Sequence, residues 1–475
     1  YSINLITDIN NIGKMPFTRR DYFRFTGGFR PSGNSGTGFN VASSDIGFLT
    51  LQNNRAKEID SKFAAANFSY SPKKTLDLSG FAIYSSTKTE LEQGSTRNYI
   101  NNAFTESTTS NSTQNSNLGL FKLSSSYRPN LNNQFDYDFF AKISDQKENQ
   151  LFTSSQIPGN ILQAQNQNPF SINQNLNYYY TLNEKNIFAL SAQHLWQDED
   201  PFYNANLQQL SFANLLTLTA PVNGISFDVS QNKRIKTNKL DAKLDYYYVI
   251  NSKSNINFNV GATISNQQFN SSIFETLNGS QNAITTPSTL NDVAYDFNDL
   301  YAGFEYKFIT GIFTFTQGGT VRDDNFSQFL PSASILLQLK KSESLRLSYS
   351  KIVSFTDINS VAQGYVFNNY NRLYSGNRNL ESSYSHNARL NYFSFNMFNY
   401  TNVFASINYN KRINAITGSI LPVGVDQIST SINSAFPNES LSGSANMQKT
   451  IGKIKGTLGA TVSLSRSTST IASLR

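Results

Sequence analysis

Apolar and polar residues alternate along most of the chain, in short runs separated by turns. The run from Ile256 to Ile264 shows this most clearly, because Phe258, Val260 and Ala262 interleave with polar or small residues. Successive side chains of a strand point to opposite faces, so the pattern predicts strands with one apolar and one polar face. About nineteen strands are predicted in an all-β chain: 1–10, 63–70, 76–86, 121–127, 135–143, 176–180, 188–194, 207–219, 225–229, 240–248, 256–264, 300–308, 311–316, 330–337, 345–351, 385–392, 403–409, 441–447 and 458–464.

The connections between these runs are alternately very short and long. Between Leu330 and Arg412 the chain makes two hairpins, which turn at 340–344 and 396–399 and are separated by a long connection. Strand, tight turn, strand and long loop form the repeating unit of an up-and-down antiparallel barrel, with tight turns on one rim and variable loops on the other. The predicted long loops are 11–58, 89–116, 146–171, 266–292 and 353–380.

Aromatic residues gather near the short turns, which bears on whether the barrel is soluble or embedded in lipid. Such rings favour the boundary between acyl chains and headgroups, so they predict an interfacial girdle and a transmembrane barrel. Two alternatives remain open: the rings could be ordinary cross-strand pairs, and a soluble β-repeat adhesin would show loops of equal length on both rims. The pairs are Phe68 and Tyr70, Tyr127 and Phe135, Tyr178 and Tyr180, Tyr246 and Tyr248, Tyr306 and Phe308, and Phe393 and Phe395.

The composition is compatible with this membrane class. Hydrophobic residues make up 38% of the 475 residues and the mean hydropathy is −0.40, but a membrane strand needs an apolar residue only at every second position. The chain has no cysteine and therefore no disulfide framework. Its net charge of +7 is small for this length and the basic residues form no stripe, which gives no support to nucleic-acid binding.

The direction of the strands leads to an expectation about the whole protein. The last predicted strand, 458–464, runs outward, whereas an even-stranded barrel ends on a returning strand. We therefore expect at least one further strand beyond Arg475 and others before Tyr1. The full barrel would have about 22 strands, about nineteen of them here. Residues 1–475 are predicted to be one barrel domain that is incomplete at both ends.

Three segments resemble TonB-dependent outer-membrane receptors. Gly376–Leu380 followed by Tyr384–Asn387 resembles the GN-x-NL…YSHN segment of that family, although Arg378 replaces the usual proline and Glu381-Ser382 replaces the usual Lys-Pro. The hairpin containing Leu330–Ser334 and Leu345–Ser350 resembles the strand pair before it. Residues 10–28 resemble the early barrel loop of Bacteroidota-type receptors with a carboxypeptidase-regulatory-like leader domain.

The resemblance implies a receptor or transporter that takes up a substrate across the outer membrane with TonB-coupled energy. It implies long loops facing the outside, where they contact substrate or a surface lipoprotein, and outer-membrane lipid around the barrel. The plug domain and the TonB-box peptide, which carry gating and energy coupling in this family, are not in the sequence. The alternative is a barrel that does not transport and instead scaffolds a larger envelope complex, for secretion or outer-membrane protein assembly, with lipoprotein partners.

No catalytic, cofactor-binding or metal site is predicted, and no individual substrate-binding residue. Nucleophile elbows, phosphate loops and dinucleotide fingerprints are missing from the sequence, so the chain is not expected to be an enzyme. His194 and His386 have no zinc-site spacing. Asp198-Glu199-Asp200 could bind Ca²⁺ with partner loops, but a solvated acidic tip explains it more simply, as it does Asp323-Asp324.

Other polar features are assigned to the barrel itself. The Gly33–Gly38 stretch lacks a strand–helix context and is expected to be a loop. One set of charged residues is expected to face the lumen, where it could pair with a plug or be hydrated: Asp136, Asp138, Asp241, Lys243 and Asp245. A set of lysines is expected on the short turns of a wet rim: Lys73, Lys74, Lys340, Lys341, Lys453 and Lys455.

Overall fold

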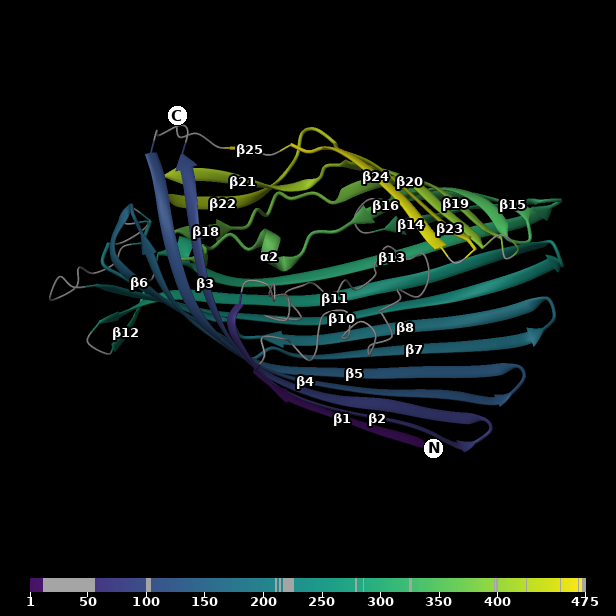
Figure 1. Ribbon diagram of the computed structural model, residues 1–475, viewed down its shortest axis with the longest axis horizontal. Coiled ribbons are helices and arrows are strands. Elements are labelled where there is room, and N and C mark those ends of the chain that lie inside the picture. Colours follow the sequence, from purple (N-terminus) through teal and green to yellow (C-terminus); the bar gives the residue numbers. More distant parts are fainter. Residues whose placement is uncertain are drawn as a thin grey trace.

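A curved antiparallel wall dominates the computed structural model, which describes residues 1–11, 56–99, 104–209, 212, 215–216, 226–277, 280–284, 286–323, 327–396, 398, 400–423, 425–452, 454–468 and 470–471. The wall belongs to a 20-stranded sheet (Figure 1). Its long strands are β1 (Ser2–Asn10), β2 (Ala56–Lys73), β3 (Leu76–Tyr99), β4 (Phe104–Asn130), β5 (Asn133–Ser154), β7 (Phe170–Asn183), β8 (Asn186–Glu199), β10 (Phe227–Asn251), β11 (Ser254–Leu277), β13 (Leu290–Thr310), β14 (Phe313–Asp323), β15 (Ser327–Lys340), β16 (Glu343–Ser354), β19 (Ser383–Asn396), β20 (Thr401–Ile413), β23 (Asn438–Ile451) and β24 (Ile454–Arg466).

Each long strand pairs with the next one in an up-and-down order, as predicted. The ladder between β10 and β11, for example, runs from Val229 opposite Glu275 to Asn251 opposite Ser254. Three short strands, β6 (Ile157–Gln167), β9 (Phe202–Leu207) and β12 (Ser280–Ala283), extend the sheet at the end away from the tight turns. Within the described ranges, β1 pairs with β2 and β24 with β23, and these two strands form the edges of the wall.

Several expected loops are strands, which corrects the sequence-based boundaries. Most of 89–116 belongs to β3 and β4, and most of 146–171 belongs to β5, β6 and β7. The expected loop 266–292 begins inside β11 and contains β12 and a 3₁₀ turn, Pro287–Thr289. These extensions were missed because strands that stand in water on both sides need no apolar alternation, while Thr, which is frequent in 89–116, still favours an extended backbone.

Two other expectations concern segments that are only partly described. The expected loop 11–58 and the Gly33–Gly38 stretch lie outside the described residues, apart from residue 11 and the first residues of β2. The strand expected at 207–219 is wrong at Phe212, which lies in a turn: its carbonyl accepts hydrogen bonds from the N–H groups of Leu215 and Leu216. Most other residues of 207–219 lie outside the described residues. The strands expected at 225–229 and 240–248 join into β10.

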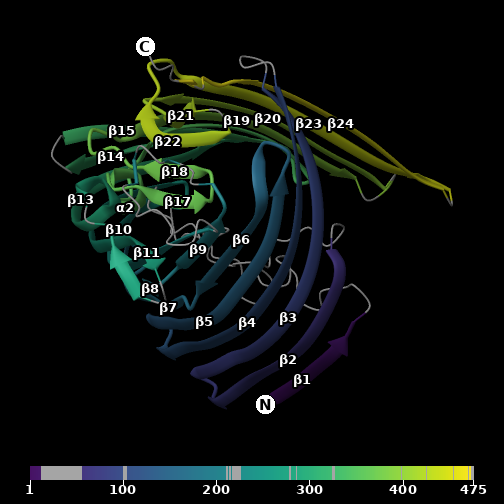
Figure 2. The same ribbon diagram turned by 90° about the vertical axis from the view of Figure 1, so that its left-hand side faces the viewer.

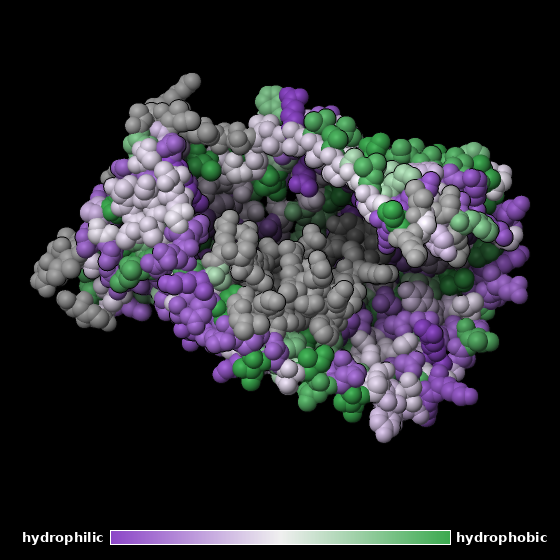
Figure 3. Space-filling model, in the orientation of Figure 1, coloured by the Kyte–Doolittle hydropathy of each residue, from purple (hydrophilic) through white to green (hydrophobic). Residues whose placement is uncertain are grey.

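The two faces of the wall differ as the alternation predicts. On β13 the exposed side chains Leu300, Phe304, Tyr306 and Phe308 share the outer face, while Asp299 on the other face is fully buried. The aromatic residues of the short-turn end share this outer face, and Phe188 stacks on its cross-strand partner Tyr246 with ring centroids 5.0 Å apart. Their role as an interfacial belt stays a prediction. Figure 3 shows hydrophobic residues gathered along the upper right side, over the β19–β24 part of the wall. An exposed apolar band of this kind suits contact with lipid.

Leu300→Arg is a direct test of this face. Leu300 lies six residues from Tyr306, or about 20 Å along the strand, which places it near the middle of a band about 25 Å tall once strand tilt is included. The arginine should lower the free energy of unfolding by about 2–4 kcal/mol. Urea titration in lipid vesicles measures it, with Leu300→Met as the control. Equal stability of the two variants would show that this face does not meet lipid.

The inner face is less uniformly polar than expected on the β2–β5 side. Phe140, which breaks the alternation of its strand, is buried on the inner face together with Phe81, Ile83, Leu118 and Leu120. Its departure from the pattern therefore reflects an apolar patch on the inner side of the wall. Of the helices in the described part of the chain, none is long and apolar enough to cross a membrane.

A second, five-stranded sheet lies at the end opposite the tight turns. It contains β17 (Val366–Asn369), β18 (Arg372–Ser375), β21 (Ile416–Val423), β22 (Asp426–Asn433) and β25 (Thr470–Ile471). We call it the mouth sheet. Figure 2 shows β17, β18 and the short helix α2 (Ile358–Val361) within the curve of the wall.

Candidate functional site

The mouth sheet joins segments that are far apart in the sequence. β17 and β18 form a hairpin within the connection between β16 and β19, and β21 and β22 form another between β20 and β23. The two hairpins meet through a parallel ladder, in which Arg372 lies opposite Gln427 and Ser375 opposite Thr430. The segment 353–380 therefore connects two wall strands, as predicted, but it contains α2 and the β17–β18 hairpin.

An apolar cluster fastens this sheet to the wall. Wall and mouth residues pack into one group in which Ile161, Ile273 and Leu373 are completely buried. Burying a large aliphatic side chain contributes about 1.5–3 kcal/mol, so the cluster opposes movement of the hairpins as a free loop. Its buried members are Ile157, Ile161, Tyr203, Ala205, Leu207, Phe212, Leu216, Val229, Ile273, Ile284, Phe367, Tyr370 and Leu373.

Buried amide side chains of the wall complete the attachment. Gln231 of β10, which is fully buried, donates to the Tyr365 carbonyl at 3.1 Å and accepts from the Phe367 N–H at 2.8 Å. Gln231 thus makes, at the edge of β17 that does not face β18, the hydrogen bonds that a neighbouring strand would make with the backbone. Asn291 of β13 brackets Gly364 in the same manner, accepting from its N–H at 2.7 Å and donating to its carbonyl at 3.0 Å.

A third amide, Gln163 on β6, makes a single hydrogen bond to the same connection. The Oε1 atom of Gln163 accepts from the Tyr370 N–H at 3.2 Å and from the Tyr203 hydroxyl at 2.6 Å. Burial raises the pKa of the Tyr203 phenol well above its usual value, so the hydroxyl keeps the proton that it donates. Three wall strands thus hold one connection: Gln231 and Asn291 each donate to it and accept from it, and Gln163 accepts one further hydrogen bond.

The Gly376–Leu380 motif has a structural role at the junction of these segments. A Cβ atom at Gly376 would lie 2.4 Å from the Ala362 carbonyl oxygen and 2.8 Å from that of Ser360, which leaves room only for glycine. Asn377 donates from its side chain to the Ser431 carbonyl and accepts from the Asn379 N–H, at 3.1 and 2.9 Å. The motif therefore ties α2 to both hairpins of the mouth sheet.

The lumen side of the wall carries a charged cluster between β10 and β14. Arg322 forms an ion pair with Asp299, and its guanidinium lies 4.7 Å from the ring centre of Tyr301. Lys243 pairs with Asp245 at 2.9 Å, and the Thr263 hydroxyl donates to Asp241 at 2.6 Å. Tyr301 and Arg322 line a cavity of about 380 Å³ on this side of the wall.

The other charged residues expected to face the lumen are also paired within the wall. Asp136 and Asp138 accept hydrogen bonds from Ser126 and Ser124, and Lys122 lies 3.8 Å from Asp138. The turn lysine Lys340 pairs with Glu343 at 3.1 Å, whereas Lys453 lies outside the described residues. The pairing gives a hydrated inner surface on which opposite charges offset each other.

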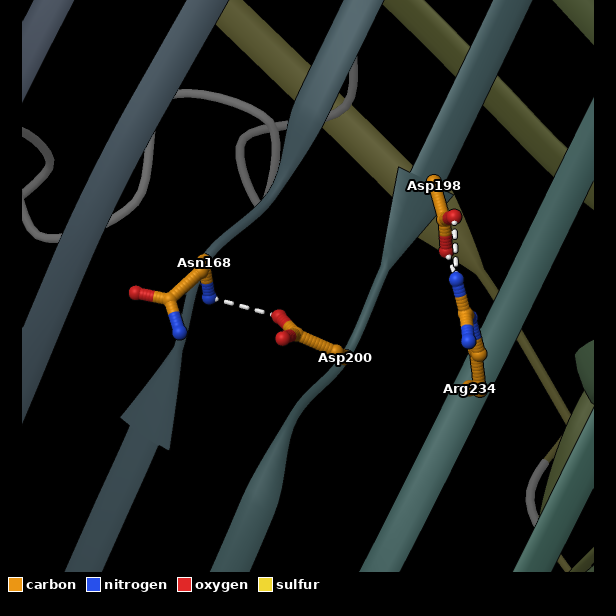
Figure 4. Close-up of polar contacts among 4 residues, drawn as sticks. All are labelled: Asn168, Asp198, Asp200 and Arg234. Atoms are coloured by element: carbon orange, nitrogen blue, oxygen red, sulfur yellow. Dashed lines mark hydrogen bonds and ion pairs between the residues drawn. The ribbon is translucent and has the colours of Figure 1, made fainter.

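The acidic stretch Asp198-Glu199-Asp200 does not form a cation site. Figure 4 shows Asp198 facing Arg234, which donates to both carboxylate oxygens at 3.1 and 2.8 Å, while Asp200 accepts from the Asn168 N–H at 2.7 Å. Glu199 accepts from Gln197. The three carboxylates are thus engaged separately, and no group of metal-ligating residues occurs in the described ranges.

The Asp198–Arg234 pair predicts a small pH effect. The hydrogen bonds from Arg234 lower the pKa of Asp198, so the pair stabilises the fold above the carboxyl's usual pKa of about 4. This contribution is lost as the pH falls through the lowered folded value. It should amount to about 0–1 kcal/mol, because the pair is partly exposed. Unfolding followed between pH 7 and 3 measures it; an identical pH profile for Asp198→Asn would contradict the assignment.

The two histidines lie in separate hydrogen-bond networks. His194 contacts Gln174 and Asn238, at 3.3 and 2.9 Å, and His386 contacts the Tyr349 hydroxyl at 2.8 Å. The polar partners of each ring come from neighbouring strands of the wall. They explain both residues as parts of the sheet surface.

Comparison with solved structures identifies the fold. Neither a family model nor a curated protein sequence matches the chain. The outer membrane transporter YddB from Escherichia coli is similar with a TM-score of 0.52 and 10% identity, over 86% of this chain and 55% of that one. The copper transporter OprC gives 0.51 and 10%, over 86% and 59%, and the RagAB peptide transporter 0.51 and 9%, over 87% and 51%.

The chain has the fold of an outer-membrane transporter barrel. It spans little more than half the length of these structures, and at such low identity the similarity concerns the fold. The resemblance to TonB-dependent receptors that Gly376–Asn387 indicates is confirmed at that level. The three matched proteins are transporters, not enzymes, in agreement with the expectation that the chain is not an enzyme.

The alternation of the sequence predicted the wall of this barrel but not its mouth sheet. The lumen-facing charges were predicted from alternation, but the partners Asp299 and Arg322 were not, because they lie outside the predicted strands 300–308 and 311–316. Gln163, Gln231 and Asn291 carry no sequence signal beyond being polar. The mouth sheet could have been suspected only from the aromatic and aliphatic residues within the expected loop 353–380.

Proposed function

We propose that the chain forms the barrel wall of an outer-membrane receptor that takes up a substrate with TonB-coupled energy. The observation that supports this most is the difference between the two faces of β10, β11 and β13. Their outer face is an exposed apolar band and their inner face carries paired charges. Such a wall separates lipid from a polar path, which is the requirement for moving a hydrophilic substrate.

Energy coupling in this proposal depends on a plug that the 475 residues do not supply. The inner charges between β10 and β14 offer a polar surface against which a plug could rest. Residues 1–475 would then act as one barrel domain, with the tight turns in the periplasm and the mouth sheet outside the cell. The substrate class is left open, since the matched structures include a copper transporter and a peptide transporter.

A second function, scaffolding of an envelope complex, is favoured by a different observation. The mouth sheet is fixed to the wall by the apolar cluster and by three buried amide side chains, so it offers a permanent outer platform. A platform of this kind suits a lipoprotein partner. It would serve a lid lipoprotein of a transporter and the lipoproteins of a larger assembly equally well.

Native mass spectrometry of the detergent-extracted full-length protein separates the two functions. A transporter should appear alone or with one surface lipoprotein, and its cells should lose uptake of the substrate when the TonB protein is deleted. A stable assembly of several different envelope proteins, with growth and uptake independent of TonB, would contradict the transport proposal and favour the scaffold.

A further inference from the structure

An outward-facing groove lies on the wall between β7 and β13, next to the ion pair in Figure 4. Its volume is about 870 Å³. The side chains of Trp196, Asp198 and Arg234 share the outer face of their strands with Leu190 and Leu240, which belong to the exposed apolar band. The groove therefore opens towards the surroundings of the barrel and away from its lumen.

The depth of the groove follows from the length of β8. Trp196 lies eight residues from Phe188 of the aromatic belt at the short-turn end, a distance of about 26 Å along a strand. With a tilt of about 40°, the height is about 20 Å, close to that of an apolar band about 25 Å tall. Trp196 thus lies at the opposite boundary of the band, and Asp198 and Arg234 lie just beyond it, at the level of lipid headgroups.

The aromatic side of the groove presents a flat apolar surface. Trp196 is the only tryptophan of the chain, and its ring packs edge-on against Phe170 with centroids 5.4 Å apart. It remains 41% exposed in spite of this contact. Phe202, the first residue of β9, also lines the groove. An exposed ring of this type can stack on the apolar face of a sugar while its N–H stays free to donate.

The polar side of the groove holds fixed donors and acceptors. Arg234 uses two of its five N–H groups on Asp198, which leaves three further donors beside a carboxylate that retains acceptor positions. Asp200 is held by the Asn168 N–H, and Asn270 and Asp292 complete the rim. The lining includes three carboxylates, whereas Arg234 is the cation on its outer face, because Lys233 lies on the opposite face of β10. This balance disfavours a phosphate and suits the hydroxyl groups of a saccharide.

We propose that this groove binds the saccharide headgroup of a glycolipid in the outer leaflet, with the sugar stacked on Trp196 and hydrogen-bonded to the Asp198–Arg234 pair. The acyl chains would run down the apolar band below it. The occupant is a lipid and not a soluble glycan, because the groove is continuous with that band. The inference uses the membrane placement of the proposed function and is independent of whether the barrel transports.

The test is native mass spectrometry of the full-length protein titrated with a short-core lipopolysaccharide, or with phosphatidylethanolamine as the lipid control. The wild type should retain one lipopolysaccharide in preference to the phospholipid. Trp196→Ala should weaken this retention about tenfold. Tyr306→Ala is the matched control, since Tyr306 has a similar exposure in the other aromatic belt, and it should retain the glycolipid as the wild type does.

Further outcomes would overturn the proposal. Equal losses in Trp196→Ala and Tyr306→Ala would mean general annular contact, and equal binding of the delipidated core saccharide would mean a soluble glycan. If Trp196→Ala does not fold, Asp198→Asn with Arg234→Gln replaces it, and the single tryptophan then reports binding by its fluorescence. No fluorescence response to lipopolysaccharide in the folded wild type would also exclude the site. A failure of TonB-dependent uptake alone would contradict the transport proposal and not the glycolipid site.

Discussion

Arg322→Leu should lower the free energy of unfolding of the barrel by about 3–5 kcal/mol, the typical cost of removing one partner of a buried ion pair. Arg322 and Asp299 are both almost completely buried on the lumen side of the wall. The substitution removes the guanidinium that is ion-paired with Asp299, and the same group is lost from the face of Tyr301. Urea unfolding in lipid vesicles, followed by Trp196 fluorescence, measures the change.

A double variant tests whether the cost comes from the uncompensated charge. Asp299→Leu combined with Arg322→Met replaces the pair with apolar groups of comparable size, and such replacements are often close to neutral. We expect the double variant to recover most of the stability lost in Arg322→Leu. A single variant that unfolds within about 1 kcal/mol of the wild type would show that the pair is solvated and not buried.

Gln231→Leu should release the mouth sheet from the wall. The leucine keeps the apolar packing but leaves the Tyr365 carbonyl and the Phe367 N–H without their side-chain partner. Each buried unsatisfied group costs about 1–3 kcal/mol. Because both groups belong to one short segment, the cost should appear as local opening. Amide hydrogen exchange should rise by about one to several orders of magnitude over β17 and β18, with little change in β10.

The matched control is Gln281→Leu, a change of the same chemistry at an exposed position in β12. It should leave exchange in the mouth sheet unchanged. Exchange that rises equally in both variants would mean that the apolar cluster alone holds the sheet. Limited proteolysis offers a second measurement, with new cleavage expected between Tyr365 and Ser375 in Gln231→Leu only.

The transmembrane part of the wall could be predicted from the sequence because lipid imposes a strict rule. Where one face meets acyl chains and the other meets water, every second residue must be apolar. The run from Ile256 to Ile264 follows this rule without exception and lies within β11. The outer residues Phe258, Val260 and Ile264 are exposed as expected. Phe140 broke the rule because the inner face near it is locally apolar.

Above the lipid band the rule no longer applies, and prediction failed there. The ends of β3 and β4 are polar on both faces, and Figure 3 shows hydrophilic residues gathered at that side of the molecule. The mouth sheet depends on a parallel ladder between segments about fifty residues apart, from Arg372–Gln427 to Ser375–Thr430. Local patterns do not encode such pairings. The acidic stretch at Asp198 was recognised, but its partner Arg234 lies on another strand.

The length of β4 limits how a membrane-anchored partner could reach the tips of β3 and β4. Thirteen residues separate Asn117, near the upper end of the outer apolar face, from the strand's start at Phe104. At about 3.3 Å per residue they span up to about 43 Å. A lipoprotein that rests on the tips of β3 and β4 while its acyl chains stay in the outer leaflet would need a tether of roughly twelve extended residues to cross the full span. Shortening the tether of such a lipoprotein should detach it from these tips although the residues that contact the barrel are unchanged.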